Sequence, residues 1–136
     1  MADLTITPGS VLAATTGVTF RDVTAGTTIT AGQVVYLDST DSDAAKLAIT
    51  TTAATAACIG IATHAALDNQ PLRILIAGNI TIGATTAVNA HYWVSSNAGF
   101  IANTAPTTGQ YGGMIGIGVS TTVIKLWLAT SGAATA

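Results

Sequence analysis

The sequence predicts an all-β domain, either a small β-barrel or a β-sandwich, preceded by an extended N-terminal arm. Three observations carry this prediction: large apolar side chains recur at every second position, short polar turns separate the apolar runs, and charge is scarce. Charged residues make up 7% of the 136-residue chain, against about a quarter in an ordinary globular domain. At this length we expect one hydrophobic core, in a single domain spanning 21–136.

The first twenty residues, 1–20, are predicted to form the arm. Strand-like pieces lie around 4–7 and 11–13, but Pro8, Gly9 and Gly17 divide them into segments too short to bury much apolar surface. Such a segment can add a strand to the sheet of a neighbouring chain. The arm side chains expected to contact a neighbour are Leu4, Ile6, Val11, Leu12 and Phe20.

Short strands are expected at 34–37, 46–49, 59–67, 92–95 and 100–102, with one possible helical turn at 51–57. The clearest alternation runs from Leu72 to Ile82, where apolar residues hold the even positions, as in a half-buried strand. We expect a bulge or turn to break this strand at Gly78 and Asn79.

A hairpin is predicted from two alternating runs, 111–119 and 123–129, on either side of a polar turn at 120–122. One face of the first run is rich in glycine, which favours the close approach of another backbone. In the second run, Trp127 shares a face with Val123 and Lys125. Trp127 either lies on the outside as an interface anchor or belongs to the core of a small barrel.

Composition also limits the partners. No run of about 18 apolar residues exists to span a bilayer as a helix, and the first residues have no basic and apolar signal pattern. The four Lys and Arg residues are scattered, so no nucleic-acid or membrane-surface partner is expected. Because a surface with little charge permits association, we expect the chain to function against neighbours.

Candidate catalytic and metal-binding groups are few. Asp38, Asp41 and Asp43 read as a solvated hairpin turn, with a weak cation site as the alternative, because an EF-hand loop would need a glycine and a bidentate acid that are missing. His64 and Asp68 would lie about 13 Å apart in a strand, too far for an acid–base pair.

The remaining candidates also favour structural roles. His91 has no ligand partner at metal-site spacing, and Cys58 between apolar neighbours is expected to be a buried small hydrophobe. The Gly-x-Gly at 112–118 lacks the third glycine and the helix of a dinucleotide site. Since the chain has no glutamate and no catalytic motif, we expect neither an enzyme nor a cofactor.

Taken in order, several segments resemble the small capsid cement or head decoration proteins of tailed bacteriophages. They are "ADLTIT", "AGTTITAGQVVYLDS", "IGIATHAALDNQPLRI", "AGNITIGATT", "YWVSSNAGFI" and "YGGMIGIGVSTTVIKLWL", and they cover nearly the whole chain. The resemblance implies a β-tulip-like or barrel domain with an N-terminal arm. It also implies a non-enzymatic homotrimer, assembled in the host cytoplasm, that binds the major capsid protein on the outer surface of the expanded head near threefold positions.

Contacts with the capsid or a neighbour are then expected from the five arm residues and Trp127. An interface lined with Thr and apolar side chains avoids the cost of burying unpaired charge. The alternative hypothesis is a small β-sandwich that binds carbohydrate or acts as a tail or receptor-binding module. It predicts that Tyr92, Trp93 and Trp127 surround a groove.

Overall fold

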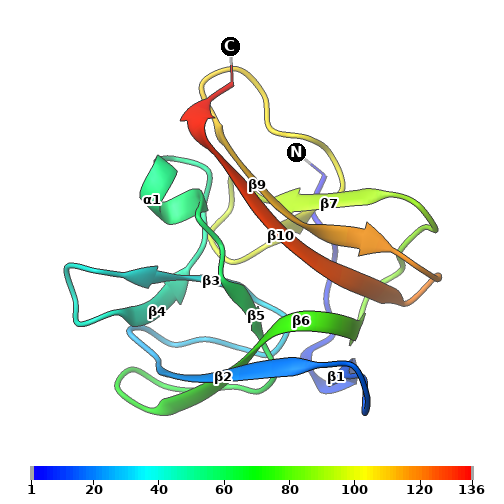
Figure 1. Ribbon diagram of the computed structural model, residues 1–136, viewed down its shortest axis with the longest axis horizontal. Coiled ribbons are helices and arrows are strands. Elements are labelled where there is room, and N and C mark those ends of the chain that lie inside the picture. The colour runs from blue at the N-terminus through cyan, green and yellow to red at the C-terminus, as the bar shows by residue number, and fades with distance from the viewer. Residues whose placement is uncertain (1, 136) are drawn as a thin grey trace.

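The computed structural model describes residues 2–135, and in that part of the chain ten strands form one curled antiparallel sheet, a half-barrel (Figure 1). The strands follow one another in the order β4-β3-β5-β6-β10-β9-β7-β8, and β1 and β2 also pair with β6. The predicted all-β class is confirmed. The elements are β1 (Val11–Ala13), β2 (Thr19–Thr24), β3 (Val34–Asp38), β4 (Ala44–Leu47), α1 (Ala53–Ala56), β5 (Gly60–Ala62), β6 (Pro71–Ile82), β7 (His91–Val94), β8 (Ile101–Ala102), β9 (Tyr111–Gly118), β10 (Val123–Ala134) and a 3-10 turn (Pro8–Ser10).

Strand β6 joins the two halves of the sheet and has neighbours on both edges. Its first half pairs with β2 and β5, and its second half pairs with β1 and β10. The core has two clusters that meet along this strand. Leu72 and Ile74 belong to the smaller cluster, whereas Leu75, Ile80 and Ile82 belong to the larger one.

A bulge in β6 changes which positions face the larger cluster. In the ladder with β2, the neighbouring residues Thr19 and Phe20 pair with Ala77 and Leu75. Ile76 between them has no partner on β2 and is the extra residue of the bulge. Gly78 follows with φ 108°, and a Cβ there would lie 2.6 Å from the carbonyl oxygen of Gly17. A break was predicted at Gly78 and Asn79; the irregularity begins two residues earlier, and the strand continues through it.

The predicted hairpin is confirmed as β9 and β10. The glycine-rich face of β9 does meet other backbone closely: a Cβ on Gly118 would collide with the carbonyl oxygen of Ala87, and one on Gly116 with that of Lys125. Strand β10 continues five residues beyond the predicted end at Ala129, pairing with β9 as far as Ala134.

Five of the strands are entered through one kind of turn. In each turn the last residue donates its backbone N–H to the carbonyl three residues earlier, and the residue before it has a positive φ, as in type II turns. In three of these turns a glutamine Oε1 also accepts the N–H of the first residue, at 2.9 Å. The residues with positive φ are Gly32, Asn69, Asn89, Gly99 and Gly109, before β3, β6, β7, β8 and β9.

The N-terminal segment has the extended backbone expected of an arm, but it lies along its own domain; Met1 falls outside the described residues. Leu4, Ile6 and Val11 pack against the larger core cluster. The Leu4 N–H donates to the carbonyl of Ile101 and the Thr7 N–H to that of Gly83, both at 2.8 Å. Of its two predicted strand-like pieces, 11–13 is β1, whereas 4–7 forms no strand.

Most of the other predicted strands are confirmed to within two residues as β3, β4, β7 and β8, and the helical turn as α1. In α1, Thr52 and Thr55 cap the first turn reciprocally through their side chains and backbone N–H groups. The predicted strand 59–67 is reduced to β5, because the chain turns at His64. Strand β2 was not predicted.

Candidate docking surface

Charge is divided unequally between the two ends of the molecule. Lys125 is the single Lys, Arg or Asp between residues 74 and 136, and the chain has no glutamate. All but one of the others lie on β2, on the β3–β4 hairpin and around the loop from β5 to β6, which we call the charged end (Figure 1). They are Arg21, Asp22, Asp38, Asp41, Asp43, Lys46, Asp68 and Arg73.

The aspartates of the β3–β4 hairpin lie in the turn between the two strands. Lys46 Nζ lies 2.8 Å from an oxygen of Asp38 and 3.2 Å from one of Asp41. The ammonium group of Lys46, together with hydrogen bonds from Thr40, lowers the pKa of Asp38 from 3.8 to about 2. Within residues 2–135 no group of three or more His, Cys or acidic side chains is placed so that it could hold a metal ion.

The other exception, Asp3, holds the N-terminal segment in place. Its carboxylate accepts hydrogen bonds from Ser95 Oγ at 2.5 Å and from Asn97 Nδ2 at 2.7 Å. The Oγ of Ser95 accepts in turn from the backbone N–H of Asn97. These bonds hold the carboxylate in place, and its negative charge makes Asp3 the one acidic group at this end of the sheet.

The opposite end presents one broad sheet face, which the register defines. Directly paired residues on antiparallel strands point to the same side, as do residues two apart on one strand. Three rows of paired residues therefore share the side away from the core, and we call this side the outer sheet face. Its rows are Leu12–Thr81–Val123, Asn79–Lys125–Ile117–His91, and Trp93–Met114–Ala129, and Trp127 lies between the last two.

Two large apolar side chains project from this face. Leu12 is 69% exposed and Trp127 is 61% exposed, so the open question about Trp127 is settled in favour of the outside. Trp93, Met114 and Ile117 are half-buried beside them. With Lys125 as its one formal charge, the face has the depleted charge and the aromatic and methionine content typical of the centre of a protein interface.

Only part of the predicted contact set lies on this face. Leu12 and Trp127 do, whereas Leu4, Ile6 and Val11 are half-buried against the chain's own core. Phe20 is 39% exposed on β2 at the charged end, where the Arg73 guanidinium lies 5.6 Å from its ring centre. Sequence reasoning did not place Met114 or Ile117 on a contact surface and named Trp93 only for the carbohydrate groove, because only the pairing of β7, β9 and β10 brings the three together.

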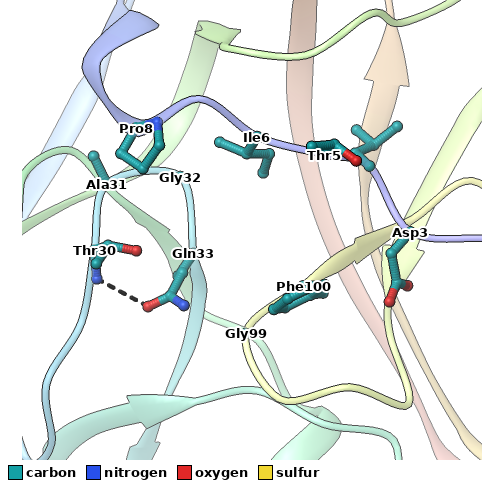
Figure 2. Close-up of a pocket in the computed structure, with 11 residues that line it drawn as sticks. Asp3, Thr5, Ile6, Pro8, Thr30, Ala31, Gly32, Gln33, Gly99 and Phe100 are labelled. Atoms are coloured by element: carbon teal, nitrogen blue, oxygen red, sulfur yellow. Dashed lines mark hydrogen bonds between the residues drawn. The ribbon is translucent and has the colours of Figure 1, made fainter.

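A groove lies beneath the N-terminal segment (Figure 2). It has a volume of about 270 Å³ and is bounded by residues 3–8, the turn 30–33 and residues 99–100. Figure 2 shows Ile6, Pro8 and Phe100 around it, with Gln33 turned toward the backbone of Thr30. Gln33 Oε1 accepts the Thr30 N–H at 2.9 Å, so this lining oxygen has a partner within the fold.

The remaining candidate groups have structural partners. His64 Nε2 accepts the backbone N–H of Arg73 at 3.0 Å, which fastens the start of β6, and no hydrogen bond is recorded between His64 and Asp68. Burial raises the pKa of the Cys58 thiol to about 11, which keeps it protonated and unreactive near neutral pH. His64 is exposed, within the ordinary surface or packed role expected of it, and Cys58 packs partly buried against the larger core cluster, close to the expected buried small hydrophobe.

The aromatic side chains that a carbohydrate site would need do not share one surface. Tyr92 is buried, and its hydroxyl oxygen accepts the N–H of Ala87 at 3.0 Å. Trp93, the next residue on the strand, points to the outer sheet face. The groove predicted by the carbohydrate hypothesis therefore does not form from Tyr92, Trp93 and Trp127.

Comparison with known proteins adds one finding. A family model described as phage cement protein matches residues 1–78, more than half of the chain, from the N-terminal segment to the bulged part of β6. Searches of curated proteins and of solved structures gave no match. Within residues 2–135, no helix has the length and apolar character needed to cross a bilayer.

Proposed function

The chain belongs to the phage cement protein family, and from this premise we propose that it binds the outside of the expanded phage head at or near threefold positions. There it stabilises contacts between major capsid subunits, as a homotrimer with no catalytic activity. The observation that carries the proposal is the outer sheet face, which is broad, nearly free of charge and provided with exposed Leu12 and Trp127.

Physical chemistry favours this face over the charged end as the contact surface. Burying the ion pairs of the charged end would require the desolvation of several charges, whereas the outer sheet face has only Lys125 to accommodate. Threonine and small apolar residues supply hydrogen bonds and contact area without that cost. The charged end is then directed toward solvent, where it keeps the particle surface soluble.

The mechanism is mechanical reinforcement through repetition. A single protomer offers a modest apolar surface, which gives weak binding, but a trimer engages several capsid subunits at once. Once one protomer is bound, the others bind at a high effective concentration. A lattice of such trimers resists separation of the subunits although each contact is weak.

The experiment is co-sedimentation of the purified protein with expanded heads of its own phage from which it has been removed. We expect saturable binding at a fixed ratio to the major capsid protein. Trp127→Lys should weaken this binding by at least about tenfold, because a charge replaces an apolar anchor. Leu67→Lys is the matched control, since Leu67 is 59% exposed but lies in the loop between β5 and β6.

Two outcomes would contradict the proposal. Failure of the wild-type protein to bind heads at any concentration would refute the capsid role. Equal weakening by the Leu67 and Trp127 substitutions would refute the assignment of the outer sheet face, because both add one positive charge at an exposed apolar position.

A further inference from the structure

Strand β10 is paired on both edges for only part of its length. β6 accompanies it from Val123 to Leu126, whereas β9 accompanies it as far as Ala134. Within residues 2–135, no strand pairs with the other edge beyond Leu126, and Figure 1 shows this half of β10 continuing past β6 with β9 at its side. The backbone groups on that edge, from Trp127 onward, lack a strand partner.

Other edges of the sheet are protected in the ways that proteins commonly use. β1 is only three residues long, and β2 has the charged residues Arg21 and Asp22. The edge of β8 is covered by the N-terminal segment, through the bridge from Asp3 to Ala102. The edge of β4 is covered in the same way by the bridge from Ala25 to Ala45.

The free edge of β10 has fewer of these protections. Its sequence from 127 to 134, "WLATSGAA", contains no charge and no proline, and the side chains from Ala129 to Ala134 are exposed. Register shifts on either side of Ala129 and Thr130 bend the strand. They limit an added strand to a short length, of about three to four residues. Helix α1 packs beside this half of β10, on the side away from β9 in Figure 1, and also reaches the ladder where Ala56 lies against Gly113.

We propose that the free edge of β10 accepts an extended, uncharged segment of the major capsid protein as an additional strand. This rests on the proposed function and deepens it by naming the backbone of the partner as the ligand. Unpaired N–H and C=O groups are recognised by another extended backbone, and their hydrogen bonds supply affinity that does not depend on charge. Trp127 lies beside the same edge, where it can cover an apolar side chain of the added segment.

A second copy of this chain fits the edge less well. To pair with β10, it would have to offer an open edge of its own, and the edges of β1, β2, β4 and β8 are short, charged or covered. Two copies would therefore pair β10 with β10 about a twofold axis, and the edge would no longer be available to the capsid. A capsid segment meets no such restriction.

The test is hydrogen exchange of the full-length protein, free and bound to heads that lack it, followed by mass spectrometry of its peptides. We expect those amides of 128–134 that do not already donate to β9 or to the Ser131 hydroxyl to exchange at least about tenfold more slowly in the bound state, because they gain hydrogen-bond partners. The amides of β2 should exchange at the same rate in both states.

A matched pair of variants gives a second readout. Ala133→Lys places a charge at an exposed position beside the free edge and should reduce head binding by about tenfold, whereas Thr24→Lys, on the already charged β2, should leave it unchanged. Circular dichroism confirms that both variants fold.

The outcomes separate the inference from the proposed function. Saturable binding of the wild-type protein with no slowing of exchange at 128–134 would overturn the inference and leave the capsid role standing. Slowing of exchange that accompanies dimer formation without heads would show that a second copy occupies the edge, and would also overturn it. A complete lack of head binding would overturn the proposed function and the inference with it.

Discussion

At the scale of single residues, Asp38 shows how one lysine organises a turn and makes it sensitive to acid. Its carboxylate accepts from Lys46 Nζ at 2.8 Å, from the Thr40 hydroxyl at 2.6 Å and from the Thr40 N–H at 3.0 Å. These bonds favour the charged form, so folding lowers the pKa of Asp38 from 3.8 to about 2. A pKa that is lower in the folded state stabilises the fold only where the carboxylate is ionised.

This linkage predicts a defined loss of stability in acid. The contribution of Asp38 is fully present above about pH 4 and disappears as the pH falls through about 2. We expect Asp38→Asn to destabilise the protein at pH 6 and to flatten the decline of its free energy of unfolding between pH 4 and pH 2. Urea denaturation at several pH values measures this.

Asp43→Asn is the control, because Asp43 lies in the same turn and takes part in none of the ion pairs of Lys46. Its φ of 58° lies in the left-handed region, which asparagine adopts readily, so this substitution keeps the turn and leaves both ion pairs of Lys46 in place. Parallel pH profiles for the wild type and Asp38→Asn would contradict the linkage.

At the scale of the element, the predictions from sequence succeeded where local pattern decides the structure. The hairpin of β9 and β10 has its alternation and its polar turn within one short stretch, and asparagine or glycine marks each of the five turns with a positive φ. Strand β2 was missed because five of its six residues are exposed, so it has no buried alternation to recognise. Its structure depends on pairing with β6, about fifty residues later.

The same limit explains the part of the candidate surface that was missed. Trp127 was found from its alternation with Lys125, although its side could not be decided from the sequence. Trp93 and Met114 join it only through a ladder with a bulge at Ile115, and a bulge inverts every later assignment of faces. Leu4 and Ile6 were assigned to a neighbour because their contacts with the core are long-range.

The N-terminal segment provides the prediction at this scale. Leu4→Ala should lower the free energy of unfolding by about 2 kcal/mol, near the low end for removing a buried leucine side chain, because Leu4 packs on the core. Leu12→Ala should lower it by less than about 0.5 kcal/mol, because Leu12 is 69% exposed. Equal, negligible effects in urea denaturation would indicate that the segment does not pack on its own domain in solution.

At the scale of the whole molecule, the division of charge connects composition to function. Ten charged side chains would be a small number for a monomer that has to stay soluble by repulsion. Gathering eight of them at the charged end leaves the other end suited to burial. Charge is therefore scarcest at the end of the fold opposite the charged end. This is the end that has the outer sheet face, which we propose contacts the capsid.

This division predicts how head binding depends on salt. Ionic strength screens interactions between charges, with a Debye length of about 10 Å at 0.1 M, and has little effect on apolar contacts and backbone hydrogen bonds. If the outer sheet face and the free edge of β10 make the contacts, only Lys125 contributes a formal charge. The dissociation constant for heads should therefore change by less than about threefold between about 50 mM and about 500 mM NaCl.

Lys125→Ala tests the origin of any salt dependence that remains. Lys125 lies in the centre of the outer sheet face, paired with Asn79 and Ile117, so its removal should abolish that remainder. A steep weakening with salt that persists both in Lys125→Ala and in Asp3→Asn would mean that the charged end meets the capsid, because all other charged side chains lie at that end. The protein would then bind in the opposite orientation, with the outer sheet face turned to solvent, where an exposed Trp127 would have no partner to explain it.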